Sequence, residues 1–416
     1  MRKTLLVFLI LTKASFGLTI DELKKLIDEK SLDIASGKEA VKKAEISKEA
    51  TFREYFPRIS LNAEFDKIYP YTTFPKETWN EQYILGVSVS SNLLNFQRNI
   101  KLKMDKVQIS LTKENIKTSR LNLYFEGISK LLKLKALEKT IKIRKDLLKS
   151  SREILAISQE KYKQGLALIT DVLKAKANLE NAKNSLQKAK KEYVKTFNGL
   201  NELVDFVLRE DEKPEVELLE RLNLPKVDIL VQEALKKRPE ILSLKKEIEI
   251  SKLNVELQKK TLSPQLTVSA SYSKMDTKFF PENDNFNFSV SLNFPIFDSG
   301  ETKLKTLASQ KDLKIKLISL KKQENAIRRE VLNAFEEVRS AIVEAESAKA
   351  FLCFSKKAYD RTFAEYKAGV SDITTLLQTF QNLKEAEENY ISALLNLNIS
   401  YYSLKKATGE LIGGKE

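Results

Sequence analysis

Few side chains in this sequence could take part in catalysis or hold a metal ion. The chain contains no histidine, which removes the commonest metal ligand and the usual general base. Cys353 is the only cysteine, so an intrachain disulfide and a cysteine-based metal site are both excluded. Cys353 follows Phe351 and Leu352 in a helical pattern, which predicts a small packed side chain. We therefore expect no enzyme, no cofactor and no metal site.

One stretch instead alternates strictly between apolar and polar residues. In FNFSVSLNFPIFDSG, residues 286–300, one parity carries Phe286, Phe288, Val290, Leu292 and Phe294. The other parity carries Asn287, Ser289, Ser291 and Asn293. Successive side chains of a strand point to opposite faces, so this segment is predicted to have one apolar face and one wet face.

The charge of the chain is basic but dispersed. Among 416 residues, 72 Lys and Arg stand against 57 Asp and Glu, for a net charge of +15. Such a balance fits nucleic acid, an anionic membrane surface or a solvated surface. The basic residues are interleaved with glutamate along helices and form no compact cluster with aromatic residues, so a nucleic-acid partner is not expected.

The N-terminus has the pattern of an export signal. Two basic residues precede an apolar run from Leu5 to Leu11, and Ser15 and Gly17 suit the minus-three and minus-one positions of a signal-peptidase site. The run is much shorter than the roughly 20 residues that span a bilayer as a helix, which argues against a membrane anchor. We expect residues 1–17 to be the signal peptide of an exported protein.

The sequence repeats itself once. YKQGLALITDVLKAKANLENAKNSL begins at Tyr162, and YKAGVSDITTLLQTFQNLKEAEENY begins 204 residues later at Tyr366. PRISLNAEF at Pro57 matches PQLTVSASY at Pro264, and a third pair of segments lies at nearly the same offset. Three landmarks at one spacing predict an internal duplication.

Each half contains two segments of strict alternation. We predict strands over Arg58–Ile68, Tyr83–Leu94, Gln265–Asp276 and Asn285–Phe297, each long enough for a tilted strand to cross a bilayer. The alternative is a small soluble sheet with one face on a core. Four strands cannot close a barrel, and an open edge in lipid leaves backbone groups unpaired, so a barrel would need several copies of the chain. Aromatic residues gather at the strand ends and in the loops, as in the interfacial belts of membrane barrels: Tyr69, Tyr71, Phe74, Trp79, Tyr83, Phe279 and Phe280.

Two long helices and their return helices make up most of the rest. No proline interrupts the pattern from about Arg98 to Gln164 or from about Thr302 to Ala368, which predicts helices of roughly 100 Å. Large residues recur every seven positions in the return helices, which keeps one seam toward a partner helix, as in coiled coils. An ordinary fibrous coiled coil is the alternative, but it leaves the strands unexplained. The seam residues are Val172, Leu179, Leu186, Tyr193 and Leu200, then Leu376, Leu383, Tyr390, Leu397 and Leu404.

These patterns divide the chain into five segments. Each repeat is expected to run helix, strand, strand, long helix, return helix. The segments are the signal peptide 1–17, the first repeat 18–204, a charged proline-containing connector 205–231, the second repeat 232–408 and a tail 409–416.

In this order and spacing, the segments resemble the TolC family of outer-membrane efflux proteins over essentially the whole mature chain. The resemblance rests on the duplication, the SPQL and FPRI strand entries, NFPIFDSG before a long helix, and the turns YKQGLALITDV and YKAGVSDITTL. It implies a mixed α/β membrane protein in which three protomers give four strands each to a twelve-stranded outer-membrane β-barrel. A long α-helical coiled-coil barrel would continue this barrel, and the apolar parity Phe286, Phe288, Val290, Leu292 and Phe294 would face lipid.

The resemblance also implies a function. It implies a homotrimeric exit duct in the outer membrane that extends into the periplasm. The duct would dock a periplasmic adaptor and an inner-membrane pump of the RND or ABC type, for efflux or type I secretion. The docking residues would be Gly165, Leu166, Gly369 and Val370 at the two helix turns, although tolerance of positive φ explains the glycines by itself. The alternatives are a secreted coiled-coil structural protein and a periplasmic adaptor, neither with a pore.

Polar links that close the helical tip are a further implication of the resemblance. Asp171 and Tyr366 match an aspartate and a tyrosine of the family, and we predict a hydrogen bond from Tyr366 to Asp171, within one protomer or across protomers. The alternative is a solvated aspartate near a helix N-terminus. Asp372 lies nearby, whereas Thr375 and Gln378 stand where some relatives carry aspartates. We therefore expect no acidic ring, and an ion selectivity that is weak or leans toward anions.

Overall fold

The computed structural model describes residues 17–68, 80–209 and 212–412. The predicted signal peptide up to residue 16, the loop aromatics Tyr69, Tyr71, Phe74 and Trp79, and the end of the tail lie outside the described residues. The elements are α1 (Ile20–Lys30), α2 (Leu32–Arg53), β1 (Arg58–Ile68), β2 (Asn80–Leu94), α3 (Phe96–Lys163), α4 (Ile169–Glu202), α5 (Val227–Lys237), α6 (Pro239–Lys259), β3 (Gln265–Asp276), β4 (Asn283–Asn293), α7 (Glu301–Lys367), α8 (Ile373–Thr408) and η1 (Glu410–Ile412).

The chain forms two compact units, and each draws on both sequence repeats. Unit 1 takes the described residues of Met1–Ser36, Ile116–Pro239 and Glu324–Glu416. Unit 2 takes the described residues of Gly37–Asn115 and Glu240–Gln323. Helices α3 and α7 contribute to both units, so the duplicated segments of sequence are not the compact units of the fold.

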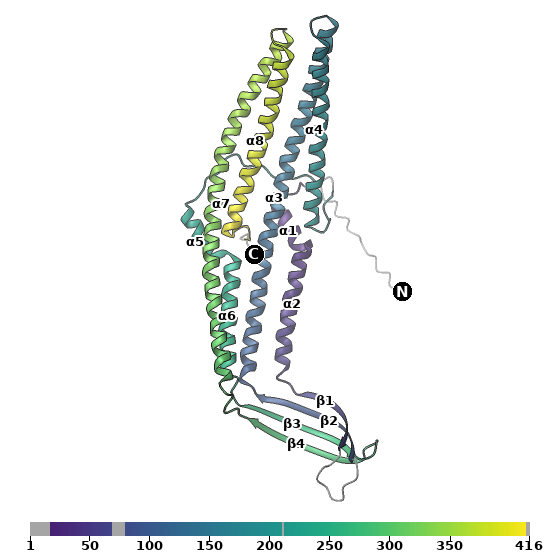
Figure 1. Cartoon of the computed structure of the whole chain (residues 1–416), viewed down its shortest axis with the longest axis vertical. Helices are drawn as coiled ribbons and strands as arrows, with labels where there is room; N and C mark the ends of the chain where they lie inside the picture. Colours follow the sequence, from purple (N-terminus) through teal and green to yellow (C-terminus); the bar gives the residue numbers. More distant parts are fainter. Residues whose placement is uncertain (1–16, 69–79, 210–211, 413–416) are drawn as a thin grey trace, which may run out of the picture. The chain divides into compact units, whose positions relative to one another are not determined.

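Unit 2 contains a four-stranded antiparallel sheet of order β1-β2-β3-β4 (Figure 1). Strands β1 and β3 have the predicted bounds, whereas β2 begins at Asn80 instead of Tyr83 and β4 runs from Asn283 to Asn293 instead of Asn285–Phe297. Strand β4 ends before Phe294 because Pro295 has no N–H to donate and restricts the residue that precedes it. The prediction that Phe294 is a strand residue is therefore wrong.

The strand register places the apolar parity of all four strands on one face. Val87 lies opposite Leu61 on one side and Tyr272 on the other, and Tyr272 lies opposite Phe286. Directly opposed residues of antiparallel strands share a face, so the apolar residues form one continuous surface. That surface consists of Ile59, Leu61, Ala63, Phe65, Tyr83, Leu85, Val87, Val89, Val268, Ala270, Tyr272, Phe286, Phe288, Val290 and Leu292.

The apolar face is not the inner side of a core in this chain. Leu61 is 75% exposed and Phe286 72% exposed. Serine, threonine and asparagine occupy the opposite face, where Ser269 and Ser289 hydroxyls pair at 2.8 Å and Asn62 donates to Ser88 at 3.3 Å. The alternative of a small soluble sheet with one face on a core is therefore not supported.

The pairing of β2 with β3 has one irregularity, near the C-terminal end of β2. The pairing with β3 runs in step down to Asn92 opposite Thr267, after which Leu94 and not Leu93 lies opposite Leu266. An extra residue of this kind is a β-bulge, which leaves one residue unpaired and restores the alternation beyond it.

Unit 1 consists mainly of two helical hairpins, α3–α4 and α7–α8 (Figure 1). The seven-residue seams are largely buried: Leu376 and Leu397 are fully buried, and Tyr193 and Tyr390 are half-buried. Along α7, small side chains pack at three- and four-residue intervals at Val331, Ala334, Val338, Ala341 and Ala345. The coiled-coil prediction is confirmed for these helices.

Cys353 on α7 contradicts its prediction. The thiol is exposed, and so are its neighbours Phe351 and Phe354. The buried stripe of α7 continues past this point through Leu352 and Tyr359, and Cys353 lies beside it.

The connector after α4 is held by two asparagine side chains. The Asn201 amide accepts from Leu208 N–H at 2.8 Å and donates to Leu208 C=O at 3.1 Å. The Asn398 amide does the same to Leu219, at 2.9 and 3.1 Å, and also donates to Leu394 C=O at 2.8 Å. Each amide thus gives the backbone of an irregular segment the hydrogen-bond partners that a neighbouring strand would otherwise supply.

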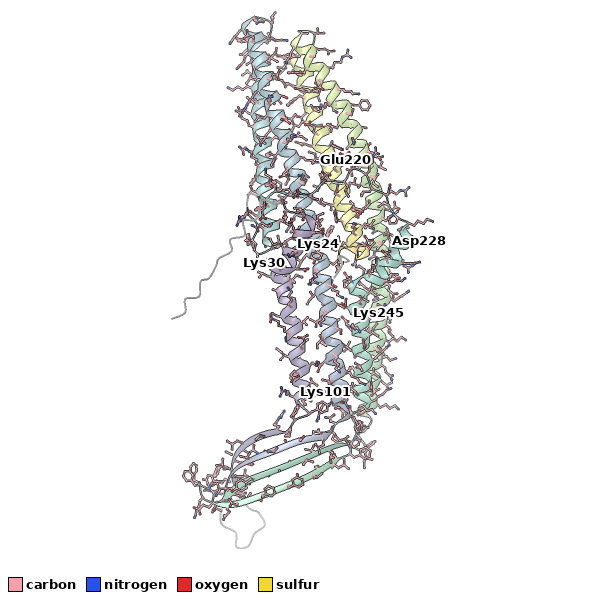
Figure 2. The ribbon with its side chains drawn as sticks, turned by 180° about the vertical axis from the view of Figure 1, so that it is seen from behind. Lys24, Lys30, Lys101, Glu220, Asp228 and Lys245 are labelled. Carbon is pink, nitrogen blue, oxygen red and sulfur yellow. The ribbon has the colours of Figure 1, made fainter. Side chains whose placement is uncertain are left out.

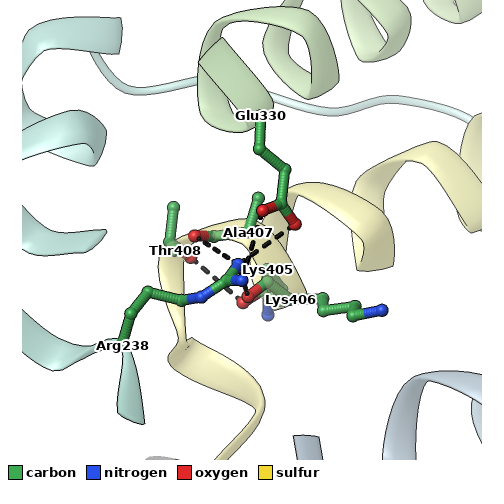
Figure 3. A network of polar contacts seen from close by, with 6 residues as sticks. All are labelled: Arg238, Glu330, Lys405, Lys406, Ala407 and Thr408. Carbon is green, nitrogen blue, oxygen red and sulfur yellow. Dashed lines mark hydrogen bonds and ion pairs between the residues drawn. The ribbon is translucent and has the colours of Figure 1, made fainter. Parts of the chain in front are cut away.

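A buried arginine just before α6 contacts the middle of α7 and the end of α8 (Figure 3). Arg238 is 5% exposed and forms a two-pronged ion pair with Glu330 of α7, at 3.1 and 3.2 Å. Its guanidinium also donates to the C=O groups of Lys406 and Ala407 in the last turn of α8. The Gly409 N–H also donates to the Lys406 C=O at 3.0 Å, and the negative end of the α8 dipole at these carbonyls suits a cation with several donors.

The environment of Glu387 in α8 disfavours the charged form of its side chain. One of its carboxylate oxygens is buried without a hydrogen-bond partner. The pKa of Glu387 is raised to about 7, first by burial and then by the neighbouring Asp146 of α3 and Glu388, while Lys356 of α7 opposes the shift. Unit 1 therefore favours the protonated form of this side chain.

Among the described residues, none of the helices combines the length and apolarity needed to cross a membrane.

We expect Asn398→Ala to destabilise unit 1 by about 3 kcal/mol. The substitution removes both backbone partners of Leu219 and the donor to the Leu394 C=O, and it leaves an empty space at the fully buried position 398. Helical melting followed by circular dichroism measures the effect. The control is Asn396→Ala, because Asn396 is exposed and bonds only Glu344 at 3.1 Å. Equal melting temperatures of the two variants would contradict the role given to Asn398.

We expect the stability of unit 1 to fall as the pH rises from about 4.5 to about 7. The folded chain keeps the Glu387 proton up to about pH 7, whereas the unfolded chain releases it near the ordinary value of 4.5. Glu387→Gln should therefore stabilise the protein by about 1 kcal/mol at pH 8 and have little effect at pH 4. Melting temperatures at both pH values, with the exposed Glu385→Gln as control, test this. An equal gain in melting temperature at pH 8 in the control variant would refute the role given to Glu387.

Candidate functional site

The two helix reversals of unit 1 have the same geometry. In the first, Leu166 N–H donates to Lys161 C=O at 2.8 Å and Gly165 N–H donates to Tyr162 C=O at 3.0 Å. In the second, Val370 and Gly369 make the corresponding bonds to Glu365 and Tyr366. This is the Schellman pattern, and it requires a left-handed residue, which is Gly165 at φ +73° and Gly369 at φ +78°. The need for a positive φ is therefore sufficient to explain both glycines.

The return helices begin with two different caps. Asp171 accepts a hydrogen bond from Leu168 N–H at 3.2 Å. In the second hairpin, Asp372 itself is the N-cap and accepts from Thr374 and Thr375 N–H at 2.7 and 3.0 Å. These bonds, first the one from the Thr375 backbone, hold the pKa of Asp372 below its usual range. Both aspartates thus stabilise helix N-termini.

The other predicted gate residues are exposed near these caps. Thr375 donates its hydroxyl to Asp372 at 2.8 Å, and Gln378 donates to Asn382 at 3.0 Å. Leu166 and Val370, which are predicted docking residues, are 73% and 80% exposed. Apolar side chains at a turn without covering neighbours in the chain are available to a partner.

The predicted hydrogen bond from Tyr366 to Asp171 is not formed within the chain, and that prediction is wrong for a single protomer. Tyr366 is 3% exposed, and its hydroxyl lies 3.0 Å from the Ser158 hydroxyl. Since Ser158 donates to Ile154 C=O at 2.8 Å, Tyr366 is the donor to Ser158. The physical reason is that α7 turns this ring into the core between the hairpins, while Asp171 is occupied at its own helix end.

Lysines complete the link between the two hairpins. The Lys161 ammonium lies 4.1 Å from the centre of the Tyr366 ring and donates to the Tyr366 C=O. Lys367 pairs with Glu153 at 2.6 Å, and Lys174 donates to the Thr374 hydroxyl at 3.1 Å. We name this set, with Ser158, the hairpin latch: Glu153, Ser158, Lys161, Lys174, Tyr366, Lys367 and Thr374.

Sequence analysis missed most of the hairpin latch, although one signal was present. A small hydroxyl residue stands four positions before the repeated tyrosine in both halves, as Ser158 before Tyr162 and Thr362 before Tyr366. Both are buried, at 0% and 9% exposure. A buried polar side chain requires a hydrogen-bond partner, and Ser158 has Tyr366 of the other half as one of its partners.

The apolar face of unit 2 ends at ion pairs on its loop side. Lys67 pairs with Glu81 at 2.7 Å across β1 and β2, and Lys274 pairs with Asp284 at 3.5 Å across β3 and β4. On β2, Glu81 lies opposite Lys67 of β1, whereas Leu85 lies opposite Lys274 of β3. The two ion pairs that end the apolar face are therefore offset by four residues, or about 13 Å along the strands. The strands are therefore strongly inclined to the apolar band, as tilted strands of a barrel are.

Within the described part of the chain, no group of three or more acidic, histidine or cysteine side chains is placed to hold a metal ion.

Known proteins share this arrangement. The chain is 20% identical over 331 residues to the outer membrane efflux protein BepC of Brucella suis, covering 79% of this chain and 72% of that protein. It is 25% identical over 192 residues to the pyoverdine export outer membrane protein OpmQ of Pseudomonas aeruginosa, which covers 43% of this chain and 38% of OpmQ. The crystal structure of CusC has the same fold, with a TM-score of 0.77 over 94% of this chain and 92% of that one at 14% identity.

The family model described as outer membrane efflux protein matches the chain twice, over residues 24–204 and 230–410. The two matches agree with the duplication that the sequence predicts. Together they cover most of the chain, which therefore belongs to the outer membrane efflux protein family.

Proposed function

We propose that three copies of this outer-membrane efflux protein form one exit duct, docked to a periplasmic adaptor and through it to an inner-membrane pump. The observation that carries the proposal is a sheet that is amphipathic across all four strands and has two free edges. Strands β1 and β4 are the ends of the strand order in the described sheet.

Free edges decide the oligomeric state. In lipid, each unpaired backbone N–H or C=O costs several kcal/mol, so β1 of one copy must pair with β4 of another. Four strands are too few for a closed membrane barrel, while three copies would give twelve, within the range of known barrels. The apolar residues Phe286, Phe288, Val290 and Leu292 would face lipid, and serine and asparagine would line the water-filled interior.

The helical part of a neighbouring copy has a surface to pack on. Along unit 2, helix α7 exposes Leu304, Leu307, Ile315 and Ile318. Separations of three, eight and three residues keep these side chains on one side of the helix, which is typical of a helix that packs against another helix. It supports a helical barrel built from several copies.

The helix reversals are the proposed adaptor-docking site. Gly165 and Gly369 set the turns, while Leu166 and Val370 offer apolar contacts of high exposure. Because the adaptor meets the tip, we propose that the hairpin latch holds the tip closed and that docking opens it. Asp171, Asp372, Thr375 and Gln378 lie beside these turns and can make the links between protomers that a single chain does not contain.

The decisive experiment is extraction of the outer membrane with mild detergent. Size-exclusion chromatography with light scattering should give three chains per particle, and the particle should form ion-conducting pores in planar bilayers. A detergent-free soluble monomer would overturn the proposal.

We expect Phe288→Lys to abolish assembly in the outer membrane, whereas Asn287→Lys should assemble. The two positions are adjacent on β4 but belong to opposite faces, and a lysine on the lipid face near the bilayer centre costs about 2–4 kcal/mol. Quantifying the membrane-extracted trimer for both variants tests this. Equal yields would mean that the two faces are not lipid and water.

We expect Lys161→Gln to raise single-channel conductance in planar bilayers. The substitution removes both the ring contact and the hydrogen bond to the Tyr366 backbone, whereas Tyr366→Phe should do less because Ser158 keeps its bond to Ile154. The control is Lys163→Gln, an exposed lysine two residues away whose contact with Glu160 is 4.0 Å. If all three variants conduct like the parent, the hairpin latch does not control the tip.

A further inference from the structure

A group of exposed apolar residues lies where the strands of unit 2 pass into its helices. We call the segments 52–58, 93–101, 259–261 and 294–303 the junction collar. Ile296 is 87% exposed and Phe297 82% exposed, the highest values among these side chains. The exposed apolar members are Phe52, Tyr55, Phe56, Leu93, Phe96, Phe294, Ile296 and Phe297.

The aromatic rings of the junction collar lie close to cationic side chains. The rings of Phe52 and Phe56 contact each other edge to face, with centres 5.8 Å apart, and the Arg53 guanidinium lies 5.9 Å from Phe56. Lys260 lies 5.9 Å from the Phe96 ring, and the buried Arg98 lies 4.4 Å from Tyr55. Aromatic rings with a polar tip or a neighbouring cation prefer the boundary between lipid and water.

The exposed charges of the junction collar are mainly basic. Exposed basic side chains are present in all four of its segments: Arg53, Arg58, Lys101, Lys259, Lys260 and Lys303. Figure 2 shows Lys101 at the sheet end of α3.

Most of the acidic groups of the collar are already occupied. Asp298 accepts from the N–H groups of Gly300 and Thr302, at 3.1 and 2.7 Å. Glu301 pairs with Lys305 at 2.5 Å. Among the described residues, Arg58, Lys101, Lys259 and Lys303 have no ion pair, so their charge is available to a ligand.

The opposite end of the same sheet differs. There both lysines at the edge of the apolar face, Lys67 and Lys274, are neutralised by Glu81 and Asp284 across the strands. Beyond these pairs, the described part of the loop end carries one exposed lysine without an ion pair beside exposed rings, Lys278 next to Phe279 and Phe280, against four unpaired cations at the helical end.

We propose that the junction collar binds the phosphate groups of anionic phospholipids in the leaflet on the helical side of the sheet. The proposal rests on the proposed function, in which the sheet crosses the outer membrane. The apolar band then ends at the level of the collar, its aromatic rings lie among the headgroups, and lysine and arginine reach the phosphates from the water side. Arginine at position 58 also offers the paired donors that suit a phosphate.

The test compares two quadruple variants of the full chain. The collar variant is Lys101→Gln, Lys259→Gln, Lys260→Gln and Lys303→Gln. The control variant removes the same charge from exposed positions of α4 in unit 1, at Lys176, Lys190, Lys191 and Lys195. Detergent-purified protein is mixed with phosphatidylglycerol or phosphatidylcholine, and the lipids that remain bound are counted by native mass spectrometry.

The parent protein should retain phosphatidylglycerol in preference to phosphatidylcholine, and the control variant should do the same. Each lysine near an anionic surface contributes about a five-fold factor, so the collar variant should lose the preference almost completely. Retention of phosphatidylglycerol by the collar variant at the control level would overturn the proposal. So would an equal loss in both variants, because the effect would then reflect net charge and not the collar.

The oligomeric state separates this proposal from the proposed function. If the collar variant is trimeric and conducting but keeps its lipid, only the lipid site is wrong. If the parent protein itself is neither trimeric nor conducting, the duct is wrong, and the lipid site with it.

Discussion

Every backbone N–H and C=O that faces lipid needs a partner, and a sheet with two ends cannot supply them all. This constraint governs the rest of the molecule. The four strands pair among themselves in one antiparallel order, which leaves the outer edges of β1 and β4 to be satisfied from outside the chain. Neither face of the sheet is covered within the chain: one face is mainly apolar and the other mainly polar.

The helices meet the same requirement by a different route. Their backbone groups pair internally, so the helical parts need only side-chain packing and properly ended termini. Those ends are specified residue by residue: Gly165 and Gly369 close two helices, Asp171 and Asp372 open two others, and Arg238 covers the carbonyls at the end of α8. Where the chain is neither helix nor strand, Asn201 and Asn398 pair with its backbone directly.

Periodicity predicted most of the fold because it records which side of each element is buried or wet. The alternation of β1 and β3 gave their bounds to the residue, and the duplicated turns located both helix reversals. The end of β4 was misplaced because alternation continues through Phe294, whereas the missing N–H of Pro295 stops the ladder. The exposure of Cys353 was missed because the sequence near it is apolar on more than one side of the helix.

The candidate site was less predictable. Asp171 and Tyr366 were identified by position, but which atoms they contact depends on the packing of hairpins that are distant in sequence. The pairing of Tyr366 with Ser158 and Lys161 joins residues about 200 positions apart, and the repeated hydroxyl residue shows that a partner is needed without identifying it. The junction collar was missed for a similar reason, since its members come from four separate segments that only the fold assembles.

The bulge near the end of β2 has a consequence for how such a chain can change its length. Elsewhere in the strands, an insertion or deletion of one residue would move every later side chain of that strand to the opposite face of the sheet. At Leu93 the ladder already accommodates one surplus position and restores the phase afterwards. Viable length variants within these strands should therefore differ from this chain by even numbers, with odd differences confined to the neighbourhood of that one residue.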